Sequence, residues 1–185
     1  MQAAQPMTLD EESALGRLFE EHHRLVFRAA HRITGSASDA EDVLQTIFVR
    51  LARRGEAERL ENPAGYLRRA AVNAALDVLR RRPALVQLDV ARRADPGLDA
   101  DTHHAASDLH EVGELRRSLR QALARLHPRA AEMFALRFLE DRGNREIARL
   151  MGTSAAVVAV TLHRARARLR RDLVDFMVAR TQRRA

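Results

Sequence analysis

The chain has 185 residues, which is enough for one domain or for two small ones. Hydrophobic residues make up 46% of it, so a packed core is possible, and the formal net charge is +7. The sequence contains no cysteine, which excludes disulfides and thiolate metal sites, and no apolar run approaches the length of a membrane span. Because the N-terminus also lacks a signal-peptide pattern, we expect a soluble protein of the cytoplasm without membrane insertion.

The positive charge is concentrated near the C-terminus, and all 32 basic residues are arginine. Residues 111–185 hold 17 arginines against 8 acidic residues, a net +9, whereas residues 1–82 hold 13 against 12, a net +1. The guanidinium group offers a fork of donors that suits phosphates and guanine edges. The sequence therefore predicts that nucleic acid meets the C-terminal third most strongly and that the N-terminal part contacts something else as well.

Two helices are expected in the first part of the chain. The first covers residues 12–33 and ends at Thr34 and Gly35, and the second follows Ser38, which forms a capping box with Glu41. The first helix has an apolar stripe of Leu15, Leu18, Phe19, His22, Val26, Ala29 and Ile33. The second has a buried face of Ala40, Val43, Leu44, Ile47, Phe48 and Leu51.

The opposite face of the second helix mixes acids, an amide and a valine. It consists of Glu41, Asp42, Gln45, Thr46 and Val49. Solvation alone would account for such a face, but the mixture also suits contact with a basic helical partner.

Pro63 opens a third helix, because a proline in the first turn of a helix has no N–H to lose. Its expected inward residues are Leu67, Ala71, Ala74 and Val78. Its polar residues at helical spacing are Arg68, Arg69, Asn73, Asp77, Arg80 and Arg81. Taken alone they are a weak signal for nucleic acid, since a solvated helix looks the same.

Residues 83–110 lack a sustained hydrophobic period and contain Pro-Gly and scattered aspartates, which predicts a flexible linker.

Helices are expected again from Glu111, with Pro128 restarting the chain. The first of them has a stripe of Leu115, Leu119, Ala122, Leu123 and Leu126. The densest apolar cluster of the chain follows and is expected to form the C-terminal core; it consists of Met133, Phe134, Leu136, Phe138 and Leu139.

Residues 142–171 have the pattern of a helix-turn-helix. Gly152 falls where a chain that reverses after a helix needs positive φ, and Thr153 or Ser154 can cap the next helix. That helix has an apolar stripe of Val158, Leu162, Ala165 and Leu169. Its other face carries His163, Arg164, Arg166, Arg168, Arg170 and Arg171. This geometry presents a helix to the major groove of DNA, whereas an ordinary helical hairpin with a solvated basic face is the simpler alternative.

Three stretches together resemble the extracytoplasmic-function (ECF) group of bacterial sigma factors, the compact class of the sigma-70 superfamily with only regions 2 and 4. They are DAEDVLQTIFVRL at 39–51, NPAGYLRRAAVNAALDVLRRR at 62–82, and LHPRAAEMFALRFLEDRGNREIARLMGTSAAVVAVTLHRARARLRRDL at 126–173. The resemblance implies an all-α protein of two small helical domains, the second a helix-turn-helix of the winged or homeodomain-like class without a sheet. Region 2 would cover 12–82, the linker 83–110, and region 4 111–178.

The resemblance also implies roles for single residues. Contact with the clamp helices of the polymerase β′ subunit falls to Glu41, Asp42, Gln45, Thr46 and Val49. Two parts of the chain would melt and recognise the minus-ten promoter element. Residues about 54–62 would hold a flipped base, and the helix after them would contact the neighbouring bases through Arg68, Arg69, Asn73, Asp77 and Arg80. Recognition of the minus-thirty-five element falls to Arg145, Ser154, Ala155, Ala159, Thr161, His163, Arg164 and Arg166. Further implied partners are the polymerase β subunit and an anti-sigma factor; no cofactor, metal or catalytic residue is implied.

Two positions depart from the family pattern. The first turns of the second helix read SAAVVAVTL, which offers few donors for base edges, so thymine methyl contacts and DNA shape would carry specificity, or the arginines would give mainly phosphate affinity. Tyr66 stands where the family often has Trp, which we interpret as a substitution within the core.

The sequence leaves two alternatives to a transcription initiation factor that is not itself an enzyme. A stand-alone helix-turn-helix regulator would have no need of residues 39–82. A His/Asp metallohydrolase on a helical bundle is disfavoured, because the eight histidines lack paired ligand spacing.

Overall fold

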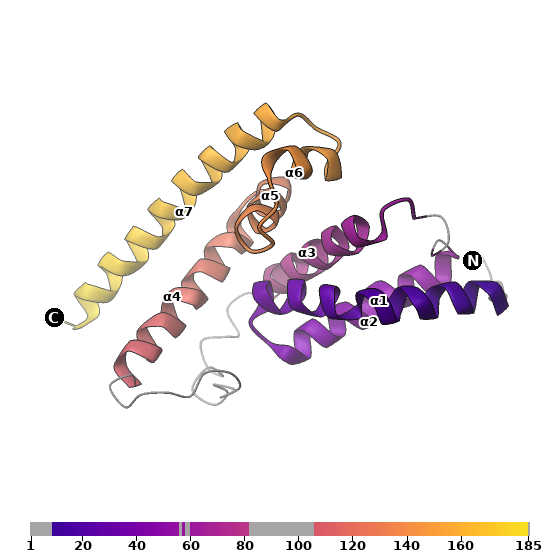
Figure 1. Cartoon of the computed structure of the whole chain (residues 1–185). Coiled ribbons are helices and arrows are strands. Elements are labelled where there is room, and N and C mark those ends of the chain that lie inside the picture. Colours follow the sequence, from indigo (N-terminus) through magenta and orange to yellow (C-terminus); the bar gives the residue numbers. More distant parts are fainter. Residues whose placement is uncertain (1–8, 56, 58–59, 82–105, 185) are drawn as a thin grey trace.

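A computed structural model of the chain describes residues 9–55, 57, 60–81 and 106–184, and in these ranges it contains seven α-helices and no strand. The all-α prediction is therefore confirmed for the described part of the chain. Most of the predicted linker, together with residues 56, 58 and 59 of the predicted base pocket, lies outside these ranges. Figure 1 shows the helices as two groups, α1 to α3 and α4 to α7.

The first group consists of α1 (Leu9–Thr34), α2 (Ala37–Arg54) and α3 (Pro63–Arg81). Gly35, with φ of +67°, reverses the chain after α1, as the sequence indicated. The predicted cap of α2 at Ser38 is wrong by two residues. Because the reversal is completed at Gly35, Ser36 is the extended residue at the helix start, and its hydroxyl oxygen accepts the N–H of Asp39 at 3.3 Å.

Pro63 opens α3 as expected, and Asn62 caps it. The Asn62 side-chain oxygen accepts the backbone N–H of Gly65 at 2.9 Å, which satisfies one of the free donors of the first turn. This cap was not predicted, although an asparagine just before a proline that opens a helix is a recognisable signal.

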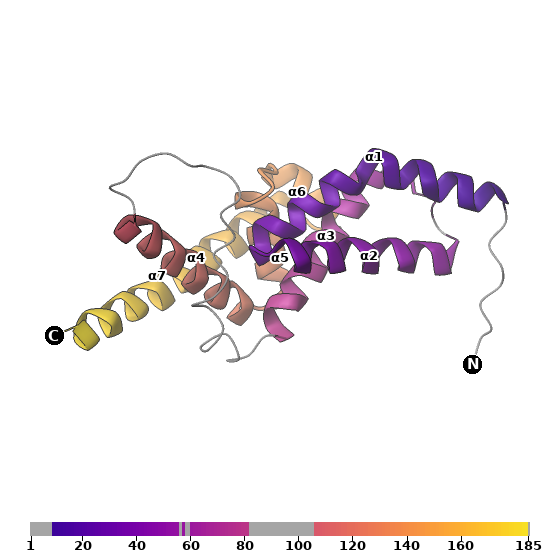
Figure 2. The ribbon, with the colours of Figure 1, turned by 90° about the horizontal axis from the view of Figure 1, so that it is seen from below.

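The second group consists of α4 (Ala106–Arg125), α5 (Pro128–Phe138), α6 (Asn144–Leu150) and α7 (Ala155–Arg184). Helix α4 begins five residues before the predicted start at Glu111, and α7 continues to Arg184. Helix α7 runs beside α4 in Figure 1 and overlaps it in the view of Figure 2, and α5 and α6 lie next to α3.

Helix α3 is the centre of the molecule, because it packs against α1 and α2 on one side and against α4, α5 and α6 on the other. The predicted inward residues Leu67 and Ala71 are fully buried, while Ala74 and Val78 are half-buried. Three further α3 residues are also fully buried, namely Val72, Ala75 and Leu76. A helix with one buried stripe would expose some of these, so the wider buried surface follows from packing on two sides.

The buried residues of the two groups form one continuous apolar core. Three apolar residues of the predicted stripes lie outside it: Phe19, Leu115 and Phe138 are 41%, 48% and 46% exposed. Phe19 instead packs its ring on Phe48 and His23, and Phe138 packs on Phe134. The exposure of Leu115 has no such explanation.

Candidate nucleic-acid and protein interfaces

The outer face of α2 is exposed to solvent. All five predicted residues, Glu41, Asp42, Gln45, Thr46 and Val49, are exposed, and Val49 exposes 48% of its surface. The face exists because the opposite stripe of α2 is buried as predicted, apart from the half-buried Leu44. It thus presents two carboxylates, an amide and an apolar side chain on one rigid helix, which suits a protein partner with basic side chains.

Part of the polar face of α3 contacts the second helical group. Arg68 donates to the Glu140 carboxylate at 2.5 Å, and Arg69 donates to the Glu132 carboxylate at 2.5 Å. Asn73 donates to the same Glu132 oxygen at 3.0 Å. Three of the five residues predicted for the minus-ten element are therefore held by α5 and the turn that follows it.

Three further hydrogen bonds cross this boundary. Arg32 of α1 donates to Glu140 at 3.2 Å and to the Leu139 carbonyl at 2.9 Å. Arg69 also donates to the carbonyl of Leu150 in α6 at 3.1 Å. The acidic side chains of these pairs are the buried members, with 2% of the Glu140 side chain and 8% of the Glu132 side chain exposed. Buried carboxylates are stable here because each receives two charged or polar donors.

Arg120 of α4 provides another contact, against the turn between α1 and α2. A Cβ atom at Gly35 would lie 2.1 Å from the Arg120 guanidinium, so a side chain there would have to displace that group. Burial lowers the pKa of Arg120, and the neighbouring charges of Arg116 and Arg117 lower it further.

The other two predicted minus-ten residues lie further along α3. Asp77 is exposed and pairs with Arg80 at 3.0 Å, one turn away on the same helix. The structure therefore separates the predicted set into three residues at the domain boundary and two that pair with each other.

The helix-turn-helix consists of α6, the turn at 151–154, and α7. Gly152 has φ of +58°, and the Thr153 N–H donates to the Ala148 carbonyl at 2.9 Å, which closes the end of α6. The Ser154 hydroxyl oxygen accepts the Val157 N–H at 3.2 Å, so Ser154 is the cap that the sequence left open between two candidates. The stripe of Val158, Leu162, Ala165 and Leu169 is buried, as predicted.

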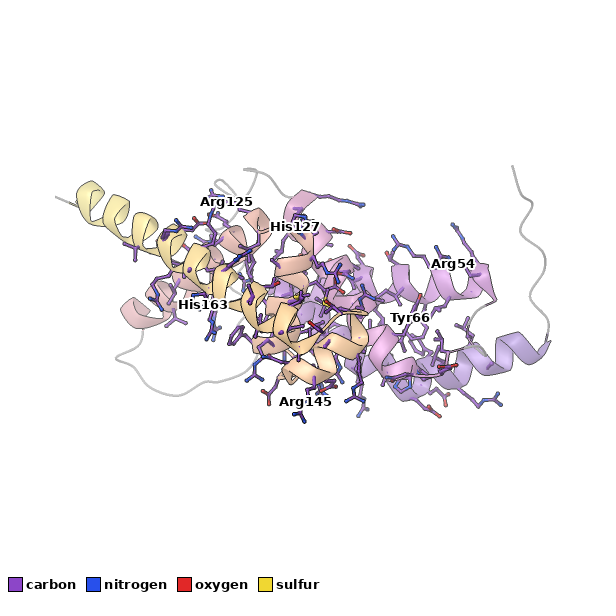
Figure 3. All side chains as sticks on the ribbon, turned by 90° about the horizontal axis from the view of Figure 1, so that it is seen from above. Arg54, Tyr66, Arg125, His127, Arg145 and His163 are labelled. Atoms are coloured by element: carbon purple, nitrogen blue, oxygen red, sulfur yellow. The ribbon has the colours of Figure 1, made fainter. Side chains whose placement is uncertain are left out.

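The start of α7 presents a mixed apolar and basic face to solvent. Among the predicted minus-thirty-five residues, Ala155 and Thr161 are half-buried. The others are exposed, namely Arg145, Ser154, Ala159, His163, Arg164 and Arg166. Figure 3 shows Arg145 of α6 and His163 of α7 at the surface of this domain. The Arg166 guanidinium lies over the Phe138 ring, 5.8 Å from its centre, and makes a cation–π contact with it.

Two exposed valines on α7 were not among the residues predicted to contact DNA. Val157 and Val160 expose 47% and 51% of their surface and lie three residues apart, so they share one helix face. Apolar side chains on a recognition helix can contact thymine methyl groups. Their exposure was not readable from SAAVVAVTL, because an alternation of valine and alanine looks equally typical of a buried helix.

An apolar groove lies between α4, α5 and α7. Its volume is about 470 Å³, and it is lined by Leu119, Phe134, Arg166, Leu169, Arg170, Leu173 and Val174. The combination of an apolar floor with two arginines suits an amphipathic segment of another protein that carries acidic residues.

Tyr66 is 39% exposed, so the interpretation of this position as part of the core is wrong. It lies in the first turn of α3, where one side of the helix faces outward, and Figure 3 labels it there.

Among the side chains that the structure describes, no three His, Asp or Glu residues lie close enough to hold a metal ion. None of the described helices is long and apolar enough to cross a membrane.

The fold and these surfaces define a two-domain helical protein that binds DNA through a helix-turn-helix, and comparison with known proteins identifies its family. The chain matches the family model described as Sigma-70 region 2 over residues 18–83 and the one described as Sigma-70, region 4 over residues 116–169. It is 33% identical over 162 residues to the RNA polymerase sigma-E factor of Streptomyces avermitilis, with 84% of each chain covered. The chain therefore belongs to the sigma-70 family, in the ECF group.

Other relatives are more distant. The ECF RNA polymerase sigma factor SigM of Mycobacterium tuberculosis is 28% identical over 161 residues, with 86% of this chain and 77% of that chain covered. A solved structure of CnrH in complex with the cytosolic domain of CnrY covers 89% of each chain at 22% identity and a TM-score of 0.49.

The protein is thus a sigma factor that directs promoter-specific transcription. The alternative of a stand-alone helix-turn-helix regulator is set aside, because residues 18–83 match region 2 of the family.

Proposed function

We propose that the outer face of α2 binds the clamp helices of the polymerase β′ subunit. Its five residues are all exposed while the opposite stripe is buried, so the face is available to a partner. This is the observation that carries the proposal. The polymerase performs the chemistry, and the sigma factor supplies promoter selection rather than an active site of its own.

We further propose that α3 and the loop before it open the minus-ten element and hold its unpaired strand. Arg68, Arg69 and Asn73 supply donors for phosphates and base edges from one helix face. Extruding a base costs a few kcal/mol, so these contacts must form as the strands separate.

The start of α7 is proposed to read the minus-thirty-five element as duplex DNA. Arg164 and the exposed His163 supply polar contacts, and Val157 and Val160 offer apolar surface to thymine methyl groups. Specificity at this element then depends on methyl contacts and DNA shape more than on bidentate hydrogen bonds.

The groove between α4, α5 and α7 is proposed as the contact for the polymerase β subunit, the second partner subunit that the family resemblance implied.

An anti-sigma factor would compete for surfaces that DNA or polymerase needs. Since the chain has no cysteine, any thiol-based sensing would belong to that partner. With these proposed partners, the proposed location of the protein is the cytoplasm.

Promoter opening by the reconstituted holoenzyme tests the role of α3. Core polymerase, the sigma factor and a promoter fragment selected from genomic DNA are combined, and unpaired thymines are detected by permanganate reactivity. Arg69→Ala with Asn73→Ala should reduce opening while polymerase binding stays normal. Arg24→Ala, an exposed α1 residue outside every proposed surface, is the matched control. Normal opening by the double variant would contradict the proposed role of α3.

A further inference from the structure

The side chains that should meet the minus-ten element are occupied within the protein itself. Arg68, Arg69 and Asn73 all donate to carboxylates of the C-terminal domain. We propose that Glu132 and Glu140 form an intramolecular latch that keeps the two domains closed over the minus-ten face of α3. The domains must then separate along this boundary before promoter DNA can bind there. This inference rests on the proposed role of α3 in minus-ten recognition.

The latch carboxylates make their side-chain contacts across the boundary. Among the described residues, Glu132 receives Arg69 and Asn73, and Glu140 receives Arg32 and Arg68, all from α1 and α3. Both glutamates are buried, at 6% and 3% exposure, and Arg68 exposes only 17% of its side chain, whereas Arg69 and Arg32 stay partly exposed. Their function is therefore to join the domains rather than to stabilise α5 alone.

A carboxylate and a phosphate present equivalent acceptors to a guanidinium group, since both form short charge-assisted hydrogen bonds with it. An arginine bound to Glu132 or Glu140 therefore cannot at the same time bind a DNA phosphate. In the closed form the latch occupies the places that single-stranded DNA would take on Arg68 and Arg69.

The boundary is packed as well as paired, so opening is a separation of two bodies rather than the movement of single side chains. The Arg120 guanidinium lies against the Gly35 turn, and a Cβ atom at Gly65 would lie 2.8 Å from the Leu150 side chain. The buried core also continues across the boundary.

The closed form leaves the other proposed surfaces free. The outer face of α2 is exposed, and so are His163, Arg164 and Arg166 on α7. The free protein can therefore meet polymerase and duplex DNA while its strand-binding face is covered. Polymerase binding that holds the two domains apart would release α3 for the melted strand.

The size of the effect follows from the closed population. If only about one molecule in ten is open, the apparent affinity for single-stranded DNA is reduced about tenfold, and a variant that opens the latch recovers this factor. The test combines Glu132→Gln and Glu140→Gln. The matched control combines Glu146→Gln and Asp172→Asn, which removes two carboxylates that pair with Arg142 and Arg168 inside the C-terminal domain.

The first readout is the distance between the domains in the full chain. Spin labels are attached at Arg24→Cys and Gln121→Cys, both exposed and unique because the chain has no other cysteine. Wild type and the control should give one short distance, and the latch variant a longer and broader distribution. Arg120→Ala, which acts on the same boundary at the Gly35 turn, should shift the distance in the same direction. Circular dichroism of each variant verifies that helicity is retained.

The second readout is binding of a fluorescein-labelled single-stranded DNA of random sequence. The latch variant should bind about tenfold more tightly than wild type, and adding Arg68→Ala and Arg69→Ala should remove the gain. Equal distance distributions in wild type and in both opening variants would overturn the latch while leaving the role of α3 open to the holoenzyme test. A longer distance without a gain in DNA binding would overturn the masking of α3 and, with it, the proposed minus-ten role.

Discussion

The guanidinium group of Arg68 and the carboxylate of Glu140 pair at 2.5 Å across 72 residues of sequence, and they join the two domains of the sigma factor. Arg68 belongs to the helix proposed to hold the melted strand, and Glu140 to the turn that leads into the helix-turn-helix. An ion pair therefore joins the proposed strand-binding helix to the helix-turn-helix domain in the free chain. DNA that binds α3 as proposed would have to replace this ion pair.

Because α3 packs on both domains, a cavity in it should destabilise the whole protein. Leu76→Ala removes a fully buried side chain and should lower the free energy of unfolding by about 2–5 kcal/mol. Denaturant unfolding measures the change. Leu115→Ala, at a residue of the same type that is 48% exposed, should change stability by less than about 0.5 kcal/mol. Equal effects of the two variants would show that α3 is not central to the core.

The cap of α2 gives a prediction with a control two residues away. Ser36→Ala removes the oxygen that accepts the Asp39 N–H and should cost about 1 kcal/mol of stability. Ser38→Ala, at an exposed position inside the helix, should be nearly neutral. Thermal or denaturant unfolding compares them, and a larger loss for Ser38→Ala would restore the capping box at Ser38 and Glu41.

The arginines of α7 should contribute to duplex binding through phosphates. Arg164→Ala and Arg166→Ala are each expected to weaken binding of duplex promoter DNA and to lower the slope of log K against log salt by about 1 per lost phosphate contact. Fluorescence anisotropy over a salt series measures the slope. Arg24→Ala removes the same charge from α1 and should leave the slope unchanged. A slope unaffected by Arg164→Ala would exclude that residue from the phosphate contacts.

The helix-turn-helix was predictable from sequence because its signals are local. Gly152 with positive φ, the Ser154 cap and the buried stripe of Val158 and Leu162 all lie within a few residues of one another. The exposed face of α2 was predictable for the same reason, since a clean apolar stripe fixes which side of a helix faces out.

The surroundings of α3 could not be predicted in this way. The partners of Arg69 and Asn73 lie 63 and 59 residues away, so no local pattern indicates that these polar side chains are covered. A helix with a basic face looks the same in a sequence whether it faces solvent, DNA or a glutamate of another domain. The cap at Ser36 was missed on a finer scale, because two serines compete and only the backbone at Gly35 decides between them.

The most direct test of the account is holoenzyme formation by wild type and by Asp42→Arg, followed by run-off transcription on a genomic promoter library. Asp42 lies on the exposed face of α2 and away from the buried stripe, so its reversal should abolish binding to core polymerase and promoter-specific transcripts. Helicity and duplex DNA binding should remain normal, because the helix-turn-helix is untouched. Holoenzyme formation by Asp42→Arg at the affinity of wild type would contradict the proposed polymerase contact.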